Sequence, residues 1–344
     1  MIKRLHWVDV AKCFGIFAIY LGHCGVAAGN AYEFVFSHHV PLFFLLSGCM
    51  EAKREALPVH KIVIRTVKQI LIPWLLFSIV SIVVSVLLFN EQYNSVVSML
   101  IAVAKGTIRS GFIAGSLWFL PCLAVVQILF GILRKLKYKV LILCLCAASL
   151  WLTQYVLQPN PLISPSWLFN VDSALYYIFY YAVGYISFPF VCKALEPKTV
   201  GGKILLSVSG AAAFVYSGLI FFGKNLLGFM APLPYMGAFS PVMTALIIIW
   251  FYFVVARIFQ NVDIFRRIGG NTLYLCGSEF LIGSIFQQCI AMLGLGLSLT
   301  TPLTSFCYVA VLLVLANQFL VPIEKRLIKA VWAIPEYFKN NKHQ

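Results

Sequence analysis

Charged residues are scarce in this chain, and acidic residues are the scarcest. Asp, Glu, Lys and Arg make up 11% of the 344 residues, and only 11 residues are acidic, whereas a soluble domain carries about 25% charged residues. Hydrophobic residues make up 61% of the chain, and its mean hydropathy is +0.92. The shortage of charge excludes a sizeable soluble domain and predicts an all-α, polytopic bundle of transmembrane helices.

Other absences exclude further classes of protein. The ten cysteines are scattered and form no CxxC or Cys/His spacing, so we expect no metal site. The net charge of +15 could suggest nucleic acid, but the basic residues fall in short loops between apolar runs, and we expect no nucleic-acid partner. Asp9 and Lys12 interrupt the first apolar run and no convincing cleavage site follows, so we expect a retained span rather than a signal peptide.

Apolar runs near the length that a bilayer requires, about 20 residues, recur along the whole chain. With the N-terminus inside, 22 of the 26 Lys and Arg residues fall in inside segments, three in outside loops and one, Lys12, in the first span. This asymmetry predicts about ten spans with both ends in the cytoplasm. We expect a transmembrane domain at 1–330 and a short basic cytoplasmic tail at 331–344. The predicted spans are 8–28, 33–51, 69–90, 114–133, 140–158, 171–192, 204–223, 239–259, 271–293 and 302–323.

The first span carries ionisable residues at a depth where lipid disfavours them. Asp9, Lys12 and His23 lie in an otherwise apolar run, and such residues tend to face a polar interior. Lys12 and His23 differ by a net rotation of about 20° and a rise of about 16 Å on a helix, so they share one face. Asp9 and Lys12 are i, i+3 neighbours and can pair.

Three motifs in about the first third of the chain resemble those of one family. Asp9-x-x-Lys12 is followed after ten residues by His23, then come the run His39-Val-Pro-Leu-Phe-Phe-Leu-Leu-Ser-Gly48 and the run Leu117-Trp-Phe-Leu-Pro121. In this order they resemble the acyltransferase 3 family of integral membrane acyltransferases. Lys12 stands where many members have Arg, which is closer to the fucose 4-O-acetylase-like branch.

The resemblance implies an O-acetyltransferase of the bacterial plasma (inner) membrane, in contact with membrane lipid. Acetyl-CoA would be the acyl donor, with no metal, and the acceptor would be a hydroxyl of a lipid-linked or cell-surface carbohydrate. His23 would be the general base, and His39 would orient His23 or bind the acceptor. The alternative for each is a structural histidine. No Ser-His-Asp or reactive-Cys signature is visible, so direct transfer is simpler than an acyl-enzyme.

The donor would be held from the cytoplasmic side. Lys12 would hold the donor's phosphates or pantetheine arm, and Asp9 would fix Lys12; the alternative is a snorkelling pair at the membrane boundary. Lys61, Arg65 and Lys68 share one face if their segment is helical and would bind the phosphates of coenzyme A, with Arg65 as the best bidentate partner. The alternative is an ordinary positive-inside loop.

Candidate acceptor-binding residues lie in three later segments. Glu279 is a carboxylate inside the ninth span, which suggests a polar cavity. Trp118 belongs to the third motif, and Tyr181 to a group of tyrosines in the sixth span; aromatic side chains can stack on sugars, and they can equally pack helices or mark the membrane interface.

Two other functions stay open from the sequence. A polytopic transporter or flippase of a lipid-linked sugar or another small solute would also carry buried charges in many spans. The missing inverted repeat and the Asp, Lys and His pattern of the first span weigh against it. A non-catalytic membrane sensor is the other alternative.

Overall fold

The protein is helical throughout the part of the chain that the structure describes. This computed structural model describes residues 4–89, 93–106, 115–157, 160–162, 165–230, 237–294 and 299–340. Its α-helices are α1 (His6–Gly22), α2 (Asn30–Phe36), α3 (His39–Ala52), α4 (Val59–Thr66), α5 (Ile72–Phe89), α6 (Tyr93–Lys105), α7 (Phe119–Leu133), α8 (Lys139–Tyr155), α9 (Val171–Leu195), α10 (Val200–Phe221), α11 (Phe239–Ile258), α12 (Asp263–Gly270), α13 (Thr272–Met292), α14 (Pro302–Leu315) and α15 (Val321–Asn340). Short 3₁₀ segments are η1 (Gly25–Ala28), η3 (Gly115–Trp118), η4 (Leu168–Asn170) and η5 (Gly228–Met230), and π-helical segments are η2 (Val67–Leu71) and η6 (Ala316–Leu320).

Many of these helices suit a bilayer. Among the described residues, eight helical segments are long and apolar enough to cross a membrane. Helices α1 and α8 have 17 residues each and fall outside this set. The predicted all-α membrane fold is confirmed, while the count of ten spans and the N-in, C-in orientation stay predictions. The eight segments are Asn30–Ala52, Val59–Leu87, Ser116–Leu133, Leu168–Leu195, Val200–Phe221, Phe239–Ile258, Thr272–Met292 and Pro302–Trp332.

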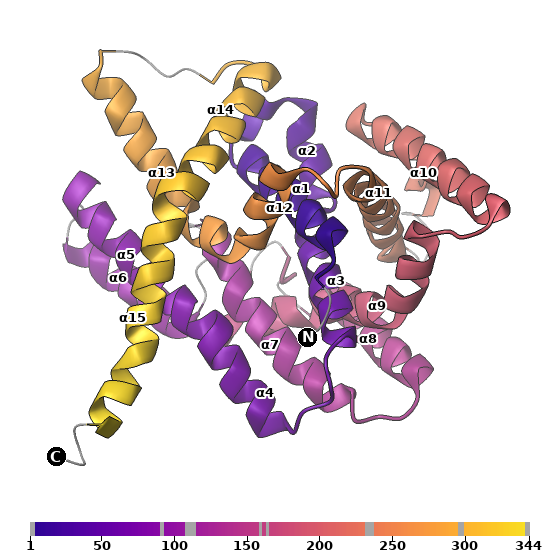
Figure 1. The fold of residues 1–344 in the computed structure, drawn as a ribbon, viewed down its shortest axis with the longest axis horizontal. Helices are drawn as coiled ribbons and strands as arrows, with labels where there is room; N and C mark the ends of the chain where they lie inside the picture. Colours follow the sequence, from indigo (N-terminus) through magenta and orange to yellow (C-terminus); the bar gives the residue numbers. More distant parts are fainter. Residues whose placement is uncertain are drawn as a thin grey trace.

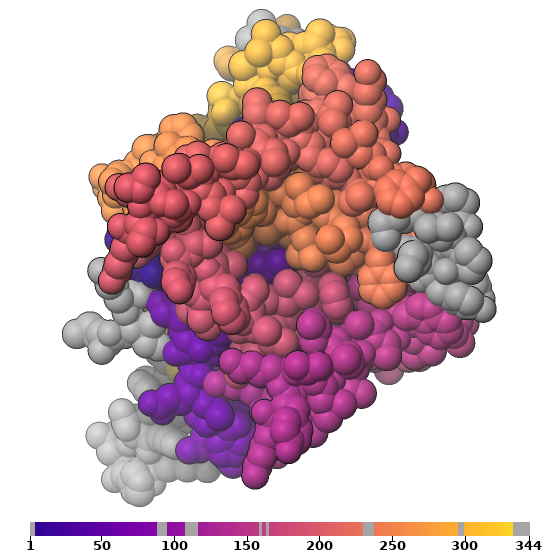
Figure 2. All heavy atoms as spheres, turned by 90° about the vertical axis from the view of Figure 1, so that its right-hand side faces the viewer, coloured from indigo at the N-terminus to yellow at the C-terminus, as the bar shows by residue number. Residues whose placement is uncertain are grey.

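Helix α1 lies in the middle of the bundle, between α10 and α11 on one side and α13 to α15 on the other (Figure 1). Val10, Ala11 and Ile16 are fully buried, as expected for a helix that is apolar on almost all sides. Figure 2 shows indigo atoms, from the N-terminal part of the chain, in a hollow between the outer helices. The outer helix α10 exposes Ile204 and Val208, which suits contact with lipid.

Glycines set the closest helix contacts around α1. A Cβ on Gly48 of α3 would overlap the carbonyl oxygen of Tyr181 on α9, and a Cβ on Gly184 of α9 would overlap that of Leu45 on α3. Small residues let helix backbones approach in this way in membrane proteins. Helices α3 and α9 are therefore closely packed against each other beside α1.

The first two predicted spans differ from the helices observed. The span predicted at 8–28 ends at Gly22, because Gly25 and Gly29 have φ angles of 60° and 57°, a left-handed conformation that glycine adopts readily. The span predicted at 33–51 is divided between α2 and α3 by a break at His38. The tail predicted at 331–344 begins within α15, and its last residues, 341–344, lie outside the described part of the chain.

Candidate functional site

His23 stands at the point where α1 ends. Its backbone N–H still bonds to the carbonyls of Ile19 and Tyr20, so the residue caps the helix. A Cβ on the preceding Gly22 would lie 3.1 Å from the ring of Phe36 on α2, which shows how closely the returning chain packs. The sharp return after Gly22 places the imidazole at the end of the central helix rather than along its side.

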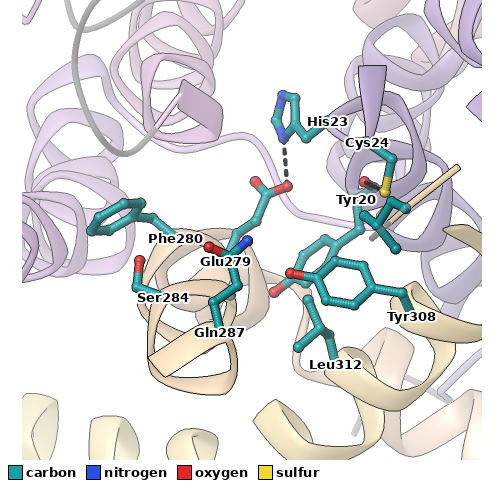
Figure 3. A pocket seen from close by; sticks show the side chains of 11 residues that line it. Tyr20, His23, Cys24, Glu279, Phe280, Ser284, Gln287, Tyr308 and Leu312 are labelled. Carbon is teal, nitrogen blue, oxygen red and sulfur yellow. Dashed lines mark hydrogen bonds and ion pairs between the residues drawn. The ribbon is translucent and has the colours of Figure 1, made fainter. Parts of the chain in front are cut away.

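Glu279 of α13 holds the imidazole of His23. His23 Nδ1 lies 2.5 Å from Glu279 Oε1 (Figure 3). The Glu279 side chain is 12% exposed and that of His23 is 41% exposed. An ionised carboxylate only accepts hydrogen bonds, so Nδ1–H of His23 donates; in the neutral form of the ring, Nε2 then carries the lone pair. The pair has the arrangement of a base oriented by a carboxylate.

Two cavities meet at His23. The first, which we call the α13 cavity, has a volume of about 550 Å³. The second, which we call the aromatic cavity, also has a volume of about 550 Å³. His23 lines both, so its ring can reach molecules in either one. The α13 cavity is lined by Tyr20, His23, Cys24, Glu279, Phe280, Gly283, Ser284, Gln287, Leu299, Tyr308 and Leu312. The aromatic cavity is lined by His23, Phe36, Ser37, His39, Val40, Pro41, Trp118, Leu162, Tyr176, Tyr177, Tyr180 and Pro241.

Trp118 and the tyrosines of α9 have fixed positions in the aromatic cavity. Tyr177 stacks on Phe44 of α3 with ring centroids 4.6 Å apart. Asn170, which has a left-handed φ of 54°, donates from Nδ2 to the carbonyls of Gly106 at 2.7 Å and of Trp118 at 3.4 Å. Asparagine tolerates this conformation better than most other non-glycine residues. The cavity wall is therefore ordered by bonds as well as by packing.

His39 lines the aromatic cavity together with His23. It begins α3, is 5% exposed, and donates from Nδ1 to the carbonyl of Val35 at 2.6 Å. Because a carbonyl cannot donate, Nδ1 carries the proton, and in the neutral form of the ring Nε2 of His39 is a hydrogen-bond acceptor. His38 is fully buried, bonds to the carbonyl of Phe34 and is not among the cavity-lining residues. The two histidines predicted to approach each other, His23 and His39, are brought to one cavity.

Lys12 lines a third, narrow cavity, which we call the Lys12 cavity and which has a volume of about 150 Å³. Its lining on α1 continues from Lys12 through Ile16 to Ile19, a rise of about 10 Å toward His23. Asp9 accepts a hydrogen bond from Arg4 Nε at 2.6 Å, and the ion pairs of the described residues do not include the possible pair of Asp9 with Lys12. Arg4 lies just before α1, and its side chain reaches the first turn of the helix. The remaining lining comes from Phe43, Ser47, Phe119, Leu120, Leu123, Thr272, Leu273 and Cys276.

The carboxylate of Glu51 binds one of the three residues that were predicted to form a basic face on the inside loop. Arg65 Nη2 donates to Glu51 Oε2 at 3.1 Å, and Arg134 Nη1 donates to Oε1 at 2.9 Å. Lys61 and Lys68 are exposed. The three residues predicted on one face therefore do not share one exposed surface, because the buried Glu51 draws Arg65 inward while Lys61 and Lys68 stay exposed. Glu51 was missed, although a carboxylate at the end of an apolar span is a visible signal.

Tyr181, the last of the predicted acceptor-binding residues, lies apart from His23. Tyr181 is 1% exposed and packs against Phe130 with ring centroids 4.9 Å apart; it does not line the aromatic cavity, whereas its neighbours Tyr177 and Tyr180 do. In the described ranges, no group of three or more His, Cys, Asp or Glu side chains could hold a metal ion.

A comparison with protein families places this site in context. The family described as "Acyltransferase domain", acyltransferase 3, matches residues 5–321. No curated protein and no solved structure gives a significant match to the chain. The matched range includes α1 and α13, the helices that carry His23 and Glu279. The chain therefore belongs to the acyltransferase 3 family.

Proposed function

We propose that this membrane acyltransferase transfers an acetyl group from cytoplasmic acetyl-CoA to a hydroxyl of a carbohydrate. The observation that carries the proposal is the pair His23–Glu279, with Nδ1 and Oε1 2.5 Å apart, at the junction of two cavities. A general base needs a fixed orientation and access to the proton that it removes. Glu279 supplies the first, and the cavities supply the second.

His23 acts as the general base in this reaction. Its Nε2 takes the proton of the acceptor hydroxyl as that oxygen attacks the thioester carbonyl. The new C–O bond forms, the C–S bond breaks, and the proton then passes from the imidazolium to the departing thiolate. Glu279 is predicted above to bind the acceptor; its bond to Nδ1 supports instead a role in orienting His23 and stabilising the imidazolium.

The donor enters from the end of α1 where Lys12 lies. The guanidinium groups of Arg65, Arg54 and Arg134 surround the single carboxylate of Glu51, which leaves an excess of positive charge for the phosphates of coenzyme A. Lys61 and Lys68 add exposed charge beside them. The Lys12 cavity offers the pantetheine arm a passage along α1, and Lys12 holds the donor at its entrance.

The acceptor occupies the aromatic cavity. Trp118, Tyr177 and Tyr180 line this cavity, and aromatic rings suit sugar faces, which carry C–H groups. Nε2 of His39 can accept a hydrogen bond from a sugar hydroxyl. We place the protein in the fucose 4-O-acetylase-like branch on the basis of Lys12, and in the bacterial inner membrane, with a lipid-linked or surface polysaccharide as acceptor.

Transport of a lipid-linked sugar remains the competing function, since cavities and buried charges serve transporters as well. Purified protein supplied with radiolabelled acetyl-CoA separates the two. An acyltransferase releases free coenzyme A thiol and an acetylated product, and mass spectrometry of surface glycans from cells with and without the gene locates the acetyl group. A protein that releases no thiol and leaves glycan acetylation unchanged is not the enzyme proposed.

A further inference from the structure

A second basic site lies at the opposite end of α1 from His23. A pocket of about 640 Å³, which we call the α12 pocket, is lined by residues from the start of α1, from helix α12 and from the junction of α14 with α15. Its lining is strongly basic and rich in amides. The residues that matter to its chemistry are Arg4, Arg266, Arg267, Asn271, Asn317 and Lys325. The proposed acyl transfer uses none of them.

The α12 pocket has more cations than carboxylates. Asp9 balances Arg4, and Asp263 balances Arg266, which also donates to His6 Nδ1 at 3.0 Å. Within the described residues, neither Arg267 nor Lys325 forms an ion pair with a carboxylate. Two positive charges are thus left for an anionic ligand.

The donors of this pocket are held in place before any ligand arrives. Lys325 Nζ donates to Asn271 Oδ1 at 2.6 Å, and Asn271 Nδ2 donates to Asn317 Oδ1 at 2.8 Å. Asn317 belongs to the π-helical segment η6, and single π turns inside helices are frequent at functional sites. Arg4 Nη2 lies close to Gly270, 2.6 Å from where a Cβ would stand, so this guanidinium lies against the end of α12.

An exposed apolar stripe runs beside the pocket. Phe319 and Ile323 are 65% and 53% exposed and are four residues apart, so they lie on one face of the helix. The adjacent face carries Gln318 and Pro322, which line the pocket. This helix belongs to the membrane-crossing candidate Pro302–Trp332, and an exposed apolar face on such a helix suits contact with lipid. A ligand that fits both surfaces has an anionic head and apolar chains.

We propose that the α12 pocket binds the phosphate headgroup of an anionic phospholipid, whose chains lie along Phe319 and Ile323. Basic pockets between membrane helices on the cytoplasmic side recognise such headgroups, and guanidinium and ammonium groups form strong charge-assisted bonds to phosphate. A free phosphate compound would use the charges but not the apolar stripe. The inference concerns binding alone and does not depend on the proposed acyl transfer.

Thermal unfolding of the purified full-length protein in an uncharged detergent tests this proposal. Short-chain phosphatidylglycerol should raise Tm, because a ligand that binds only the folded state stabilises it, whereas phosphatidylcholine of the same chain length should not. In Arg267→Ala/Lys325→Ala the apparent affinity for phosphatidylglycerol should fall about tenfold or more. The variant Arg267→Gln/Lys325→Gln should lose the same affinity. It removes the two charges in a second way, so that a folding defect in the alanine variant does not decide the result.

The matched control is Lys139→Ala/Lys203→Ala, which removes two exposed charges from the first turns of α8 and α10 and should keep the phosphatidylglycerol effect. Coenzyme A is tested in parallel as a soluble phosphate source. The proposal is overturned by an equal Tm rise with phosphatidylcholine, by no rise with phosphatidylglycerol, or by an equal loss in the control. It is also overturned if the pocket variants lose coenzyme A binding while phosphatidylglycerol still binds normally.

Discussion

At the scale of single residues, the bond between His23 and Glu279 determines which imidazole nitrogen can act as a base. Both residues are recognisable in the sequence as ionisable groups inside apolar spans. Their partnership is not, because they are 256 positions apart and meet only when α13 packs beside α1. For the same reason, the sequence did not reveal Glu51 as the common partner of Arg65 and Arg134.

Glu279→Gln should lower kcat by about 10²-fold with little change in KM for acetyl-CoA. The amide can still accept a bond from Nδ1 but carries no charge to stabilise the imidazolium. Initial rates with radiolabelled acetyl-CoA measure the effect. The control is Glu33→Gln, the same change at an exposed site on α2. Equal rates in the two variants would remove Glu279 from the reaction.

Arg65→Ala should raise KM for acetyl-CoA about tenfold or more, the value of one charge-assisted hydrogen bond. Folding should be retained, because Glu51 keeps Arg134 at 2.9 Å and Arg54 at 3.3 Å. Lys61→Ala should have a smaller effect in the same direction. Unchanged KM in both variants would leave Arg65 as a structural counterion and the loop as a topology signal.

At the scale of helices, the apolar runs of the sequence predicted the positions of most helices. They did not predict where a helix breaks or which helices contact one another. The end of α1 at Gly22 depends on left-handed turns at Gly25 and Gly29, and glycine alone does not reveal whether a helix continues. The π-helical segments η2 and η6 follow from packing and have no signature in hydrophobic periodicity. Close contacts such as Gly48 against α9 become visible only once helices are paired.

Gly184→Ala should destabilise the protein by about 1–3 kcal/mol, since the added methyl group has no room against the α3 backbone. Gly201→Ala is the control: a Cβ there meets nothing within 4 Å, and alanine in a helix should stabilise by up to about 1 kcal/mol. Thermal unfolding in detergent compares them. A Gly184→Ala variant as stable as Gly201→Ala would show that the α3–α9 contact is not tight.

At the scale of the whole molecule, composition was sufficient to predict an all-α membrane protein. Composition does not determine the number of membrane spans as well. Helices α1 and α8 are shorter than the eight candidate spans, yet both pack within the bundle. Loop charge, rather than helix length, supports both as spans. The predicted orientation in the membrane depends on the same loop charges. The packing of the helices alone gives no information about which end faces the cytoplasm.

Topology can be measured directly by cysteine labelling. In a background with the exposed Cys144, Cys289 and Cys307 replaced by serine, Lys137→Cys should react with an impermeant maleimide only from the cytoplasmic side. Asn160→Cys should react only from outside. Both sites lie in loops that flank α8. Reaction of both from one side would mean that α8 does not cross the membrane.

The most direct test of the proposed chemistry is acetyl transfer by the His23→Gln variant. Glutamine keeps approximate size and hydrogen bonding but cannot accept the proton, so kcat should fall by about 10²–10⁴-fold, while the protein inserts and binds acetyl-CoA normally. His60→Gln, at an exposed histidine on α4, should retain full turnover. Near-normal turnover by His23→Gln would contradict the general-base role and direct attention to His39.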